Sequence, residues 1–382
     1  MILGIDASNI RQGGGVTHLV EILRIADPVS SGFSRVVLWA NRKVLDAIED
    51  RQWLTKISDP VFEKNLIYRA YWQRFRLSRA ARLEKCDVLF APGGSYAAGF
   101  RPVVTMSRNM LPFEWSELKR FGYSAMTLKL LVLRLVQIRT FNRADGLIFL
   151  TRYSREIVLR AMQTPPPNSA TIAHGVSSRF LRAPVSQRPL EEYSAQTPFR
   201  ILYVSIVHMY KHQWNVSKAV ADLRKAGLPV TLTLTGPAYG PALDRLERTL
   251  DEVDPKREFI RYSGEVSNDA LPEHYAEHHL AVMASSCETM PNLLLEGMAS
   301  GLPVASSNRG PMPEMLGDSG VYFDPENVSD IARAFKELIE SPELRARMAA
   351  RSYARAQEYS WQRCSDQTFE MLATVARGTT AA

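Results

Sequence analysis

The chain has few cysteines and no long apolar run, and these two absences exclude several classes of protein. The three cysteines, Cys86, Cys287 and Cys364, lie far apart in the 382 residues and form no paired motif. They predict neither a disulfide framework nor a zinc site, and a reducing, cytoplasmic setting fits best. No apolar stretch reaches the roughly 20 residues that a membrane-spanning helix needs. The N-terminus has no positively charged leader, so we expect a first strand there rather than a signal peptide.

Clusters of metal-ligating residues are also scarce. His274, His278 and His279 include an i, i+4 pair, which can hold a metal ion on one face of a helix. Because no third ligand accompanies the pair, we interpret these histidines as packing or surface residues.

Charge is unevenly distributed along the chain. Residues 1–190 contain 28 Lys and Arg against 14 Asp and Glu, a net charge of +14, whereas the remainder carries −7. This asymmetry indicates that the first half faces an anionic membrane surface or a phosphate-bearing substrate, with a basic solvated surface as the open alternative. Segments 68–82 and 119–143 mix basic with apolar or aromatic residues, which is typical either of an interfacial helix or of an ordinary helix with arginines at its rim. No nucleic-acid motif accompanies them, so we expect no nucleic-acid partner.

Short apolar runs alternate with longer helical patterns, which predicts an α/β fold with parallel sheets and helices on both faces. The expected strands are 2–6, 36–39, 87–90, 102–106, 146–150, 201–204, 230–235, 259–262, 280–283 and 303–306. A stretch rich in proline and polar residues, 183–198, interrupts this alternation and is typical of a linker. We therefore predict two doubly wound domains, 1–185 and 199–360, followed by a helical stretch, 361–382, that can pack back on the first domain.

Two glutamates, Glu288 and Glu296, mark the most informative segment, 285–304. An apolar run precedes them, Pro291 suits the first turn of a helix, and Gly301 suits its end. Glu288 is therefore expected in the loop before a helix and Glu296 on the helix itself. Between them, backbone N–H groups and the positive end of the helix dipole form a ready site for phosphate.

Three weaker features point to the same chemistry. The run 13–15 of three glycines opens a helix, where the backbone can approach a ligand, although a simple tight turn is as good an interpretation. Lys211 lies where a strand gives way to a helix, at the edge where open sheets bind ligands, although most such lysines are merely solvated. Val266, in the loop after another strand, could present backbone groups to a nucleobase.

Together these residues closely resemble the retaining nucleotide-sugar glycosyltransferases called glycosyl transferases group 1, which have GT-B architecture. The resemblance covers nearly the whole chain and is strongest over 200–323, including the sequences Pro-Met-Pro-Glu at 311–314 and Gly-Val-Tyr-Phe-Asp-Pro at 320–325. The Glu-x7-Glu segment followed by Gly-Met-Ala-Ser-Gly-Leu-Pro-Val is highly specific. The resemblance implies two Rossmann-like doubly wound domains that face a central cleft.

The resemblance also implies roles for individual residues. Glu288 would contact the donor sugar near its reacting carbon, Glu296 the ribose hydroxyls, and Lys211 the donor phosphates. The expected contacts with the rest of the donor come from Gly14, Gly15, Ser205, His208, Val266, Asn292 and Leu293. Lys211 and the helix N-terminus would stabilise the departing diphosphate. The chain has no Asp-x-Asp triplet, so we expect neither a metal ion nor another cofactor.

The chain departs from the family pattern in two places. Many relatives carry an arginine about six residues before the lysine, whereas this chain has none there, and His208 or Arg309 are the candidate substitutes. Relatives often have His-Asp near the acceptor, where this chain has Arg108 and Asn109. Arginine cannot act as a base at ordinary pH, so we expect Arg108 to bind an anionic acceptor such as a lipid diphosphate.

The sequence analysis therefore predicts a retaining hexosyltransferase that uses a UDP- or GDP-linked sugar. Its acceptor would be a hydroxyl of a glycan or a lipid-linked molecule, in the synthesis of a cell-surface polysaccharide, and its location the cytoplasm or the inner membrane face. A nucleotide-sugar 2-epimerase and a catalytically inactive donor-binding scaffold remain the alternatives.

Overall fold

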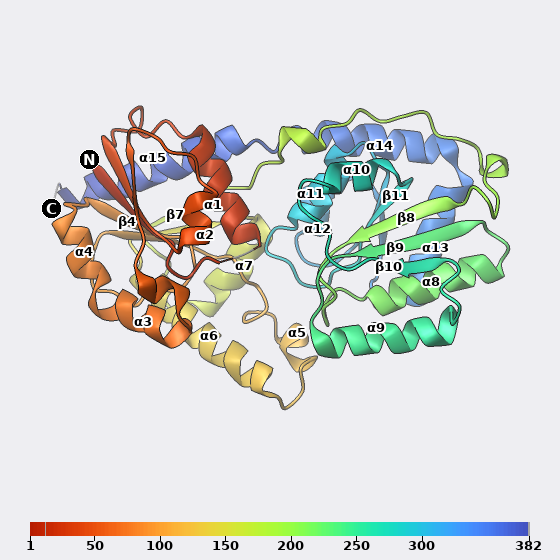
Figure 1. Ribbon diagram of the computed structural model, residues 1–382, viewed down its shortest axis with the longest axis horizontal. Coiled ribbons are helices and arrows are strands. Elements are labelled where there is room, and N and C mark those ends of the chain that lie inside the picture. Colours follow the sequence, from red (N-terminus) through yellow and green to blue (C-terminus); the bar gives the residue numbers. More distant parts are fainter. Residues whose placement is uncertain (12, 381–382) are drawn as a thin grey trace. The chain divides into compact units, whose positions relative to one another are not determined.

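The computed structural model describes residues 1–11 and 13–380, which form two compact units (Figure 1). The first unit contains Met1–Trp115, Tyr123–Gly175 and the chain from Ser360 onward, and the second contains Ser116–Gly122 and Val176–Tyr359. Residues 176–185, which the sequence analysis assigned to the first domain, are bound to the second unit. The N–H of Val176 donates to the carbonyl of Tyr359 at 3.1 Å, and that of Arg182 donates to the carbonyl of Ala299 at 3.0 Å.

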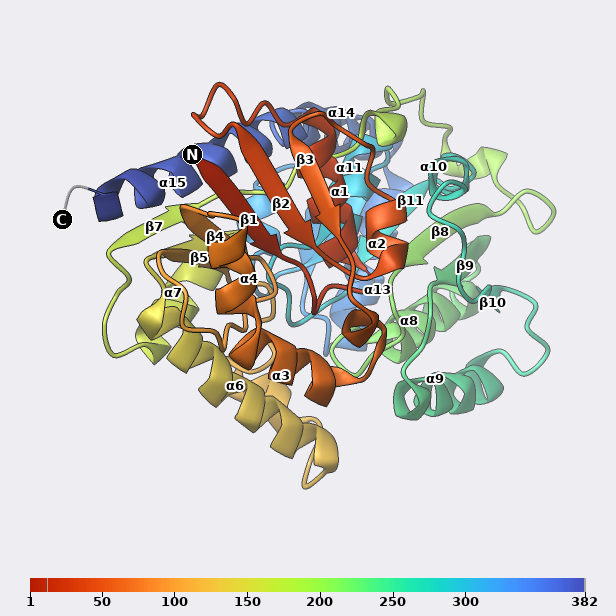
Figure 2. The same ribbon diagram turned by 60° about the vertical axis from the view of Figure 1, so that its left-hand side comes forward.

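The first unit is built on a fully parallel sheet of seven strands in the order β3-β2-β1-β4-β5-β6-β7, three of which are labelled at the front of Figure 2. The strands are β1 (Ile2–Asp6), β2 (Arg35–Trp39), β3 (Leu54–Ile57), β4 (Val88–Ala91), β5 (Val103–Met106), β6 (Gly146–Phe149) and β7 (Asn168–Thr171). The helices are α1 (Gly14–Ile25), α2 (Arg42–Asp46), α3 (Leu66–Phe75), α4 (Leu77–Leu83), α6 (Ala125–Arg143), α7 (Arg152–Ala161) and α15 (Trp361–Thr380). The strand order reverses between β1 and β4, which is the kind of position where open α/β sheets bind ligands.

The long C-terminal helix α15 belongs to the first unit although it follows the whole second unit in sequence. The hydroxyl of Ser365 donates to the carbonyl of Ile22 at 2.9 Å, which fixes α15 against α1. The rings of Phe33 and Phe369 meet edge to face, with centroids 6.3 Å apart, in the core beneath. Burial of this apolar face attaches α15 to the sheet of the first unit.

The second unit contains a parallel sheet of six strands in the order β10-β9-β8-β11-β12-β13. The strands are β8 (Phe199–Val204), β9 (Val230–Thr235), β10 (Ile260–Tyr262), β11 (Leu280–Met283), β12 (Val304–Ser307) and β13 (Val321–Phe323). The helices are α8 (Gln213–Lys225), α9 (Gly240–Val253), α10 (Leu271–Ala276), α11 (Asn292–Ala299), α12 (Met312–Leu316), α13 (Val328–Glu340) and α14 (Pro342–Ala356). Another short helix, α5 (Trp115–Lys119), begins where the chain passes from the first unit to the second. The order of this sheet reverses between β8 and β11, so the loops that follow these two strands share one position at the carboxyl edge.

Among residues 1–11 and 13–380, no helix has both the length and the apolar character that crossing a membrane requires.

Candidate active site

A buried ion pair lies at the carboxyl edge of the second sheet. The ammonium group of Lys211, in the loop between β8 and α8, contacts Oε1 of Glu288, in the loop between β11 and α11. The side chains of Lys211 and Glu288 are only 5% and 15% exposed. The reversal between β8 and β11 therefore unites two residues that lie 77 positions apart and that the sequence analysis assigned to one site.

Hydrogen bonds hold both loops in place around this pair. The hydroxyl of Tyr203 donates to the carbonyl of Lys211 at 2.8 Å, and the N–H of Ser286 donates to the carbonyl of Tyr210 at 2.9 Å. His212 has a left-handed backbone, with φ of 51°, and its ring nitrogen lies 2.9 Å from the hydroxyl of Ser286. These bonds tie the β8–α8 loop to the β11–α11 loop and thereby fix the position of the lysine.

The environment of the pair suits the binding of an anion. A buried ammonium group is costly without a partner, and Glu288 provides one. The ring of Tyr210 adds a further favourable contact, with its centroid 5.3 Å from the ammonium nitrogen of Lys211. A bound phosphate could compete with this carboxylate for the ammonium group of Lys211.

His208 cannot serve as a second cation at this edge. Its ring stacks on Tyr239, with centroids 4.9 Å apart, and Nδ1 is buried without a hydrogen-bond partner among the described residues. Burial, together with the positive charge of Lys211, lowers the pKa of His208 to about 4, so the ring is neutral near pH 7. Arg309, the other candidate for the missing arginine, instead pairs with Asp324 at 3.0 Å.

The second predicted glutamate, Glu296, lies on α11. Its Oε2 is buried and has no hydrogen-bond partner among the described residues. Burial raises the pKa of Glu296 to about 8, and the charge of Arg179 only partly opposes this effect. The carboxyl group is therefore largely protonated near pH 7 unless hydrogen-bond donors are supplied to it.

Helix α11 begins at Asn292, one residue later than the sequence analysis predicted. Pro291 precedes the helix as its N-cap instead of forming part of the first turn, and its own side chain makes no capping hydrogen bond. Asn292 and Leu293 are the first two residues of α11, and both are partly exposed. The amide end of this helix therefore directs its positive dipole toward the loop that contains Glu288.

Two other predicted donor-binding residues, Ser205 and Val266, lie in different surroundings. Ser205 is buried, its N–H donates to the carbonyl of Thr235 at 2.7 Å, and its hydroxyl donates to the carbonyl of Ile206 at 2.9 Å. Val266 is partly exposed in the loop after β10, at the same edge of the sheet as the ion pair. The hydroxyl of Ser205 is thus engaged, whereas the backbone around Val266 lies on the open edge.

In the first unit, Arg108 belongs to the loop after β5, and its guanidinium group packs against the first turn of α1. A Cβ atom placed at Gly15 would be 3.1 Å from Nη1 of Arg108, so the guanidinium group lies close to the backbone of Gly15. Burial lowers the pKa of Arg108 to about 10, and among the described residues it forms no hydrogen bond or ion pair. The structure therefore places Arg108 beside Gly15. Asn109 instead directs Oδ1 to its own loop, where it accepts from the N–H of Leu111 at 3.1 Å.

The sequence analysis missed a stack of aromatic rings beside this arginine. The rings of His18 and His174 are 4.8 Å apart, and those of His174 and Trp361 are 5.3 Å apart. Both ring nitrogens of His18 are buried without partners among the described residues, and burial lowers its pKa well below the usual value. The helical pattern indicated only that His18 lies on α1, and no local signal links it to residues 174 and 361.

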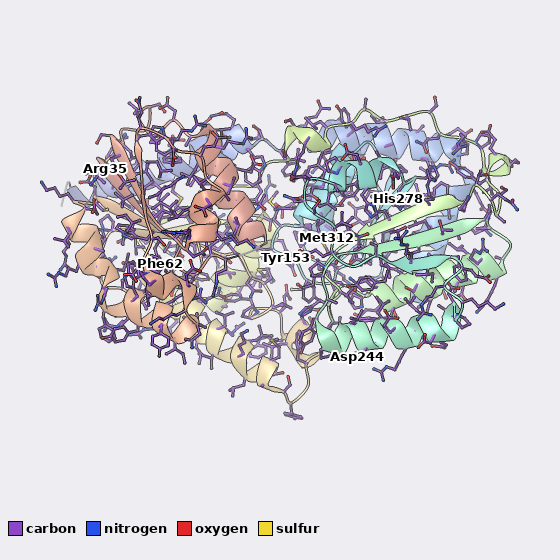
Figure 3. All side chains as sticks on the ribbon, in the orientation of Figure 1. Arg35, Phe62, Tyr153, Asp244, His278 and Met312 are labelled. Carbon is purple, nitrogen blue, oxygen red and sulfur yellow. The ribbon has the colours of Figure 1, made fainter. Side chains whose placement is uncertain are left out.

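The three C-terminal histidines of the sequence analysis are packing residues. The ring of His278 lies 2.7 Å from the carbonyl of His274 and 3.1 Å from the hydroxyl of Thr233, inside the second unit (Figure 3). The ring of His279 accepts from the N–H of Arg200 at 2.9 Å. These contacts agree with the packing interpretation. Within the described part of the chain, no group of three or more His, Cys, Asp or Glu is arranged to hold a metal ion.

A known family model and several curated proteins resemble the second unit. The model of the family described as "Glycosyl transferases group 1" matches residues 190–355. Among curated proteins, the O-antigen chain mannosyltransferase B of Escherichia coli is 28% identical over 232 residues. This match covers 60% of the present chain and 60% of that protein's own length.

Solved structures match over nearly the full length. The Anabaena protein Alr3699/HepE, in complex with UDP and glucose, has a TM-score of 0.70 and 17% identity, with 98% of this chain and 100% of that chain covered. WaaG, a glycosyltransferase of lipopolysaccharide biosynthesis, has a TM-score of 0.68 and 13% identity, with 97% and 99% covered. These likenesses show that the fold is GT-B, as predicted from the sequence.

Proposed function

Because residues 190–355 belong to the glycosyl transferases group 1 family, we propose that the protein transfers a hexose from a nucleoside-diphosphate sugar to an acceptor hydroxyl. The observation that carries this proposal is the buried pair of Lys211 and Glu288 in the loops that precede α8 and α11. Together with the amide end of α11, this arrangement holds two positive groups and one carboxylate at a reversal of strand order, which suits an anionic donor.

In the proposed reaction, Lys211 exchanges Glu288 for the diphosphate of the donor. The bond between the anomeric carbon and the phosphate oxygen breaks, and the lysine and the amide end of α11 stabilise the charge that develops on the departing group. The acceptor oxygen bonds to the anomeric carbon on the same face, and its proton passes to the departing phosphate oxygen. The configuration is thus retained, and Glu288, released from the lysine, favours the positive character of the sugar ring.

Glu296 is proposed to bind the ribose of the donor. Its buried Oε2 lacks a partner, and ribose hydroxyls would supply the missing hydrogen bonds. Donation to the carboxylate favours its charged form, so donor binding would lower the raised pKa of Glu296 and release a proton near pH 7.

Arg108 is proposed to bind an anionic group of the acceptor. The guanidinium group and the N-terminus of α1 are both positive, and no carboxylate pairs with Arg108 among the described residues. An anion between them would relieve this repulsion. Acceptors that carry a phosphate or diphosphate, such as lipid-linked sugars, have the required charge.

The relatives guide the choice of substrates for testing. HepE was crystallised with UDP-glucose, and the Escherichia coli relative is an O-antigen mannosyltransferase. UDP-glucose and GDP-mannose are therefore the first donors to test, with a role in polysaccharide synthesis as the expected setting. The proposed reaction uses no metal ion, so we expect activity to survive treatment with a chelator.

One incubation separates the proposed function from its alternatives. The purified chain is mixed with each donor, with and without a lipid-linked diphosphate sugar, and the products are analysed by mass spectrometry and NMR. Release of the nucleoside diphosphate with a product of unchanged anomeric configuration supports the proposal. An isomerised sugar would identify an epimerase instead, and donor binding without any reaction would identify a scaffold.

A further inference from the structure

Two helices of the first unit present apolar side chains to solvent. The described residues include sixteen exposed large hydrophobic side chains, of which five lie on α3 and four on α6. On α3 these side chains are Leu66, Ile67, Tyr68, Tyr71 and Phe75, and on α6 they are Leu128, Val132, Leu135 and Val136. Their exposed fractions range from 43% to 77%. A concentration of this kind is typical of an interaction surface.

Both helices bury apolar side chains, such as Trp72 on α3 and Phe141 on α6, but they also bury polar side chains and expose many apolar ones. On α6, the buried residues include Gln137 and Thr140, whereas Leu128, Val132 and Leu135 follow the outward face at helical spacing. On α3, Arg69 and Gln73 are buried, whereas the apolar and aromatic side chains point outward. Folding of the unit alone does not require apolar residues on these faces, which indicates that an apolar medium covers them.

The two helices flank one loop and lie side by side in both views (Figures 1 and 2). The side chain of Gln73 donates to the carbonyl of Ser95 at 3.2 Å and accepts from the N–H of Ala97 at 3.1 Å. From the other side, the hydroxyl of Thr140 accepts from the N–H of Tyr96 at 3.1 Å. Because the inner faces of α3 and α6 grip the same loop, their outer faces form neighbouring parts of one surface, which we call the α3/α6 surface.

The charge of this surface has one sign. Residues 66–83 contain five arginines, residues 123–143 contain three arginines and one lysine, and neither segment contains Asp or Glu. The exposed basic residues are Arg74, Arg76, Arg79, Arg82, Lys129, Arg139 and Arg143. Such a surface is complementary to an anionic plane.

Cations also lie over the exposed aromatic rings of the α3/α6 surface. The ammonium group of Lys64 is 5.0 Å from the ring centroid of Tyr68, and the guanidinium group of Arg74 is 5.3 Å from that of Phe75. In the middle of α6, the guanidinium group of Arg134 is 4.8 Å from the ring centroid of Trp115, on the neighbouring α5. Aromatic rings with adjacent cations are common where proteins meet lipid headgroups.

We propose that the α3/α6 surface docks the protein on the face of an anionic lipid bilayer. The apolar and aromatic side chains enter the boundary between headgroups and acyl chains, and the arginines contact lipid phosphates. A partner protein would more often offer an interface with charges of both signs, whereas a bilayer offers a plane of one sign over an apolar layer. This proposal concerns the first unit alone and does not depend on the proposed transferase activity.

Flotation of the full chain with vesicles tests the proposal. We expect the protein to float with vesicles of phosphatidylglycerol and phosphatidylcholine, to bind vesicles of phosphatidylcholine alone more weakly, and to be released by salt. Two triple variants remove the apolar anchors, namely Ile67→Ser/Tyr71→Ser/Phe75→Ser on α3 and Leu128→Ser/Val132→Ser/Leu135→Ser on α6. Each should lower the vesicle partition coefficient by about tenfold or more, because binding scales with the apolar area that is inserted.

A matched control carries the same number of exposed apolar changes elsewhere. Val29, Leu181 and Val185 are 64%, 39% and 62% exposed and lie outside α3 and α6. The variant Val29→Ser/Leu181→Ser/Val185→Ser should bind vesicles within about twofold of the unchanged protein, because its anchors are intact. Circular dichroism checks that all three variants are folded, which is expected because every substituted side chain is exposed.

Two results would overturn the proposal. The first is a failure of the unchanged protein to float with anionic vesicles, or equal flotation of the anchor variants and the control. The second is a dimer, detected by sedimentation velocity, that the anchor variants dissociate while vesicle binding is absent. That result would assign the α3/α6 surface to a second copy of the chain.

Discussion

The two units differ in how the positive charge of their principal cation is neutralised. In the second unit, Lys211 is buried and neutralised by Glu288, whereas in the first unit Arg108 lies on a helix N-terminus with no carboxylate partner among the described residues. The second unit is therefore balanced until an anion displaces the glutamate. In the first unit, the positive charge of Arg108 is not neutralised by a carboxylate of the described residues, so a bound anion would provide its first partner. We infer that the two cations bind different anionic groups, the diphosphate of the donor and a charged group of the acceptor.

Removing Lys211 should have the largest effect on activity. We expect Lys211→Ala to lower kcat by about 10²- to 10³-fold, the usual cost of losing one group that stabilises developing charge. It should also lower Tm, because Glu288 is left mostly buried without its partner. Steady-state kinetics and thermal unfolding measure the two effects.

The double variant Lys211→Met/Glu288→Gln is the matched control for that experiment. It removes both charges, so we expect it to recover most of the lost Tm but none of the lost kcat. If it recovers activity as well, the lysine serves stability alone and the proposed phosphate contact is wrong.

Reversing the charge of Arg108 should have the next largest effect. We expect Arg108→Glu to raise the KM for a phosphate-bearing acceptor by about 10- to 100-fold, from the loss of a charge-assisted hydrogen bond, with little change in the donor KM. The acceptor KM of Arg108→Lys should lie between those of the unchanged protein and Arg108→Glu. Equal increases in the donor KM and the acceptor KM would contradict the inference that Lys211 and Arg108 bind different anionic groups.

Glu296 should make stability depend on pH. Its folded pKa of about 8 lies above the ordinary value of 4.5, so the folded chain holds the proton more tightly than the unfolded chain does. The stability of the unliganded protein should therefore fall as pH rises from about 5 to 8, by about 3.5 kcal/mol more than for Glu296→Gln. Urea unfolding at several pH values measures this difference. A saturating nucleoside diphosphate should reduce it, and identical pH profiles of the two proteins would show that Glu296 is not buried as described.

His208 should have the smallest effect. Because burial holds the pKa of His208 near 4, the ring stays neutral between pH 6 and 8 and contributes no charge to phosphate binding. We expect His208→Asn to raise the donor KM by about 2- to 10-fold, the range for one neutral hydrogen bond. The factor should be the same at pH 6 and at pH 8. A factor that grows as the pH is lowered would indicate a charged histidine and a second cation in the site.

Much of the fold could be predicted from the sequence because most strands are buried apolar runs. The strands β3 and β7 were missed, since Leu54–Ile57 is only partly buried and Asn168–Thr171 contains three polar residues. The remaining strands were found within a residue or two, apart from the short β13 at the edge of the second sheet. Short edge strands lack the periodicity on which such a prediction rests.

The sequence predicted that Lys211 and Glu288 lie at one site, and the structure brings them into contact, but the other contacts of the predicted residues could not be foreseen. The specific motif singled out Glu288 and Glu296, and the junction of a strand with a helix singled out Lys211. Whether a side chain faces a ligand or its own loop depends on the folded surroundings. Ser205 and Asn109 accordingly turned inward to hydrogen-bond their own loops, and no local pattern distinguishes that outcome. The pairing of Arg108 with Gly15 likewise depends on the neighbouring ends of β5 and α1.

Calorimetric titration with nucleotides tests the central claim most directly, namely that Lys211 exchanges Glu288 for a diphosphate. UDP and GDP are compared with uridine and guanosine, on the unchanged protein and on Lys211→Met/Glu288→Gln. The account predicts that one diphosphate binds the unchanged protein much more tightly than its nucleoside does, and that most of this advantage disappears in the double variant. An advantage of the same size in both proteins would contradict it.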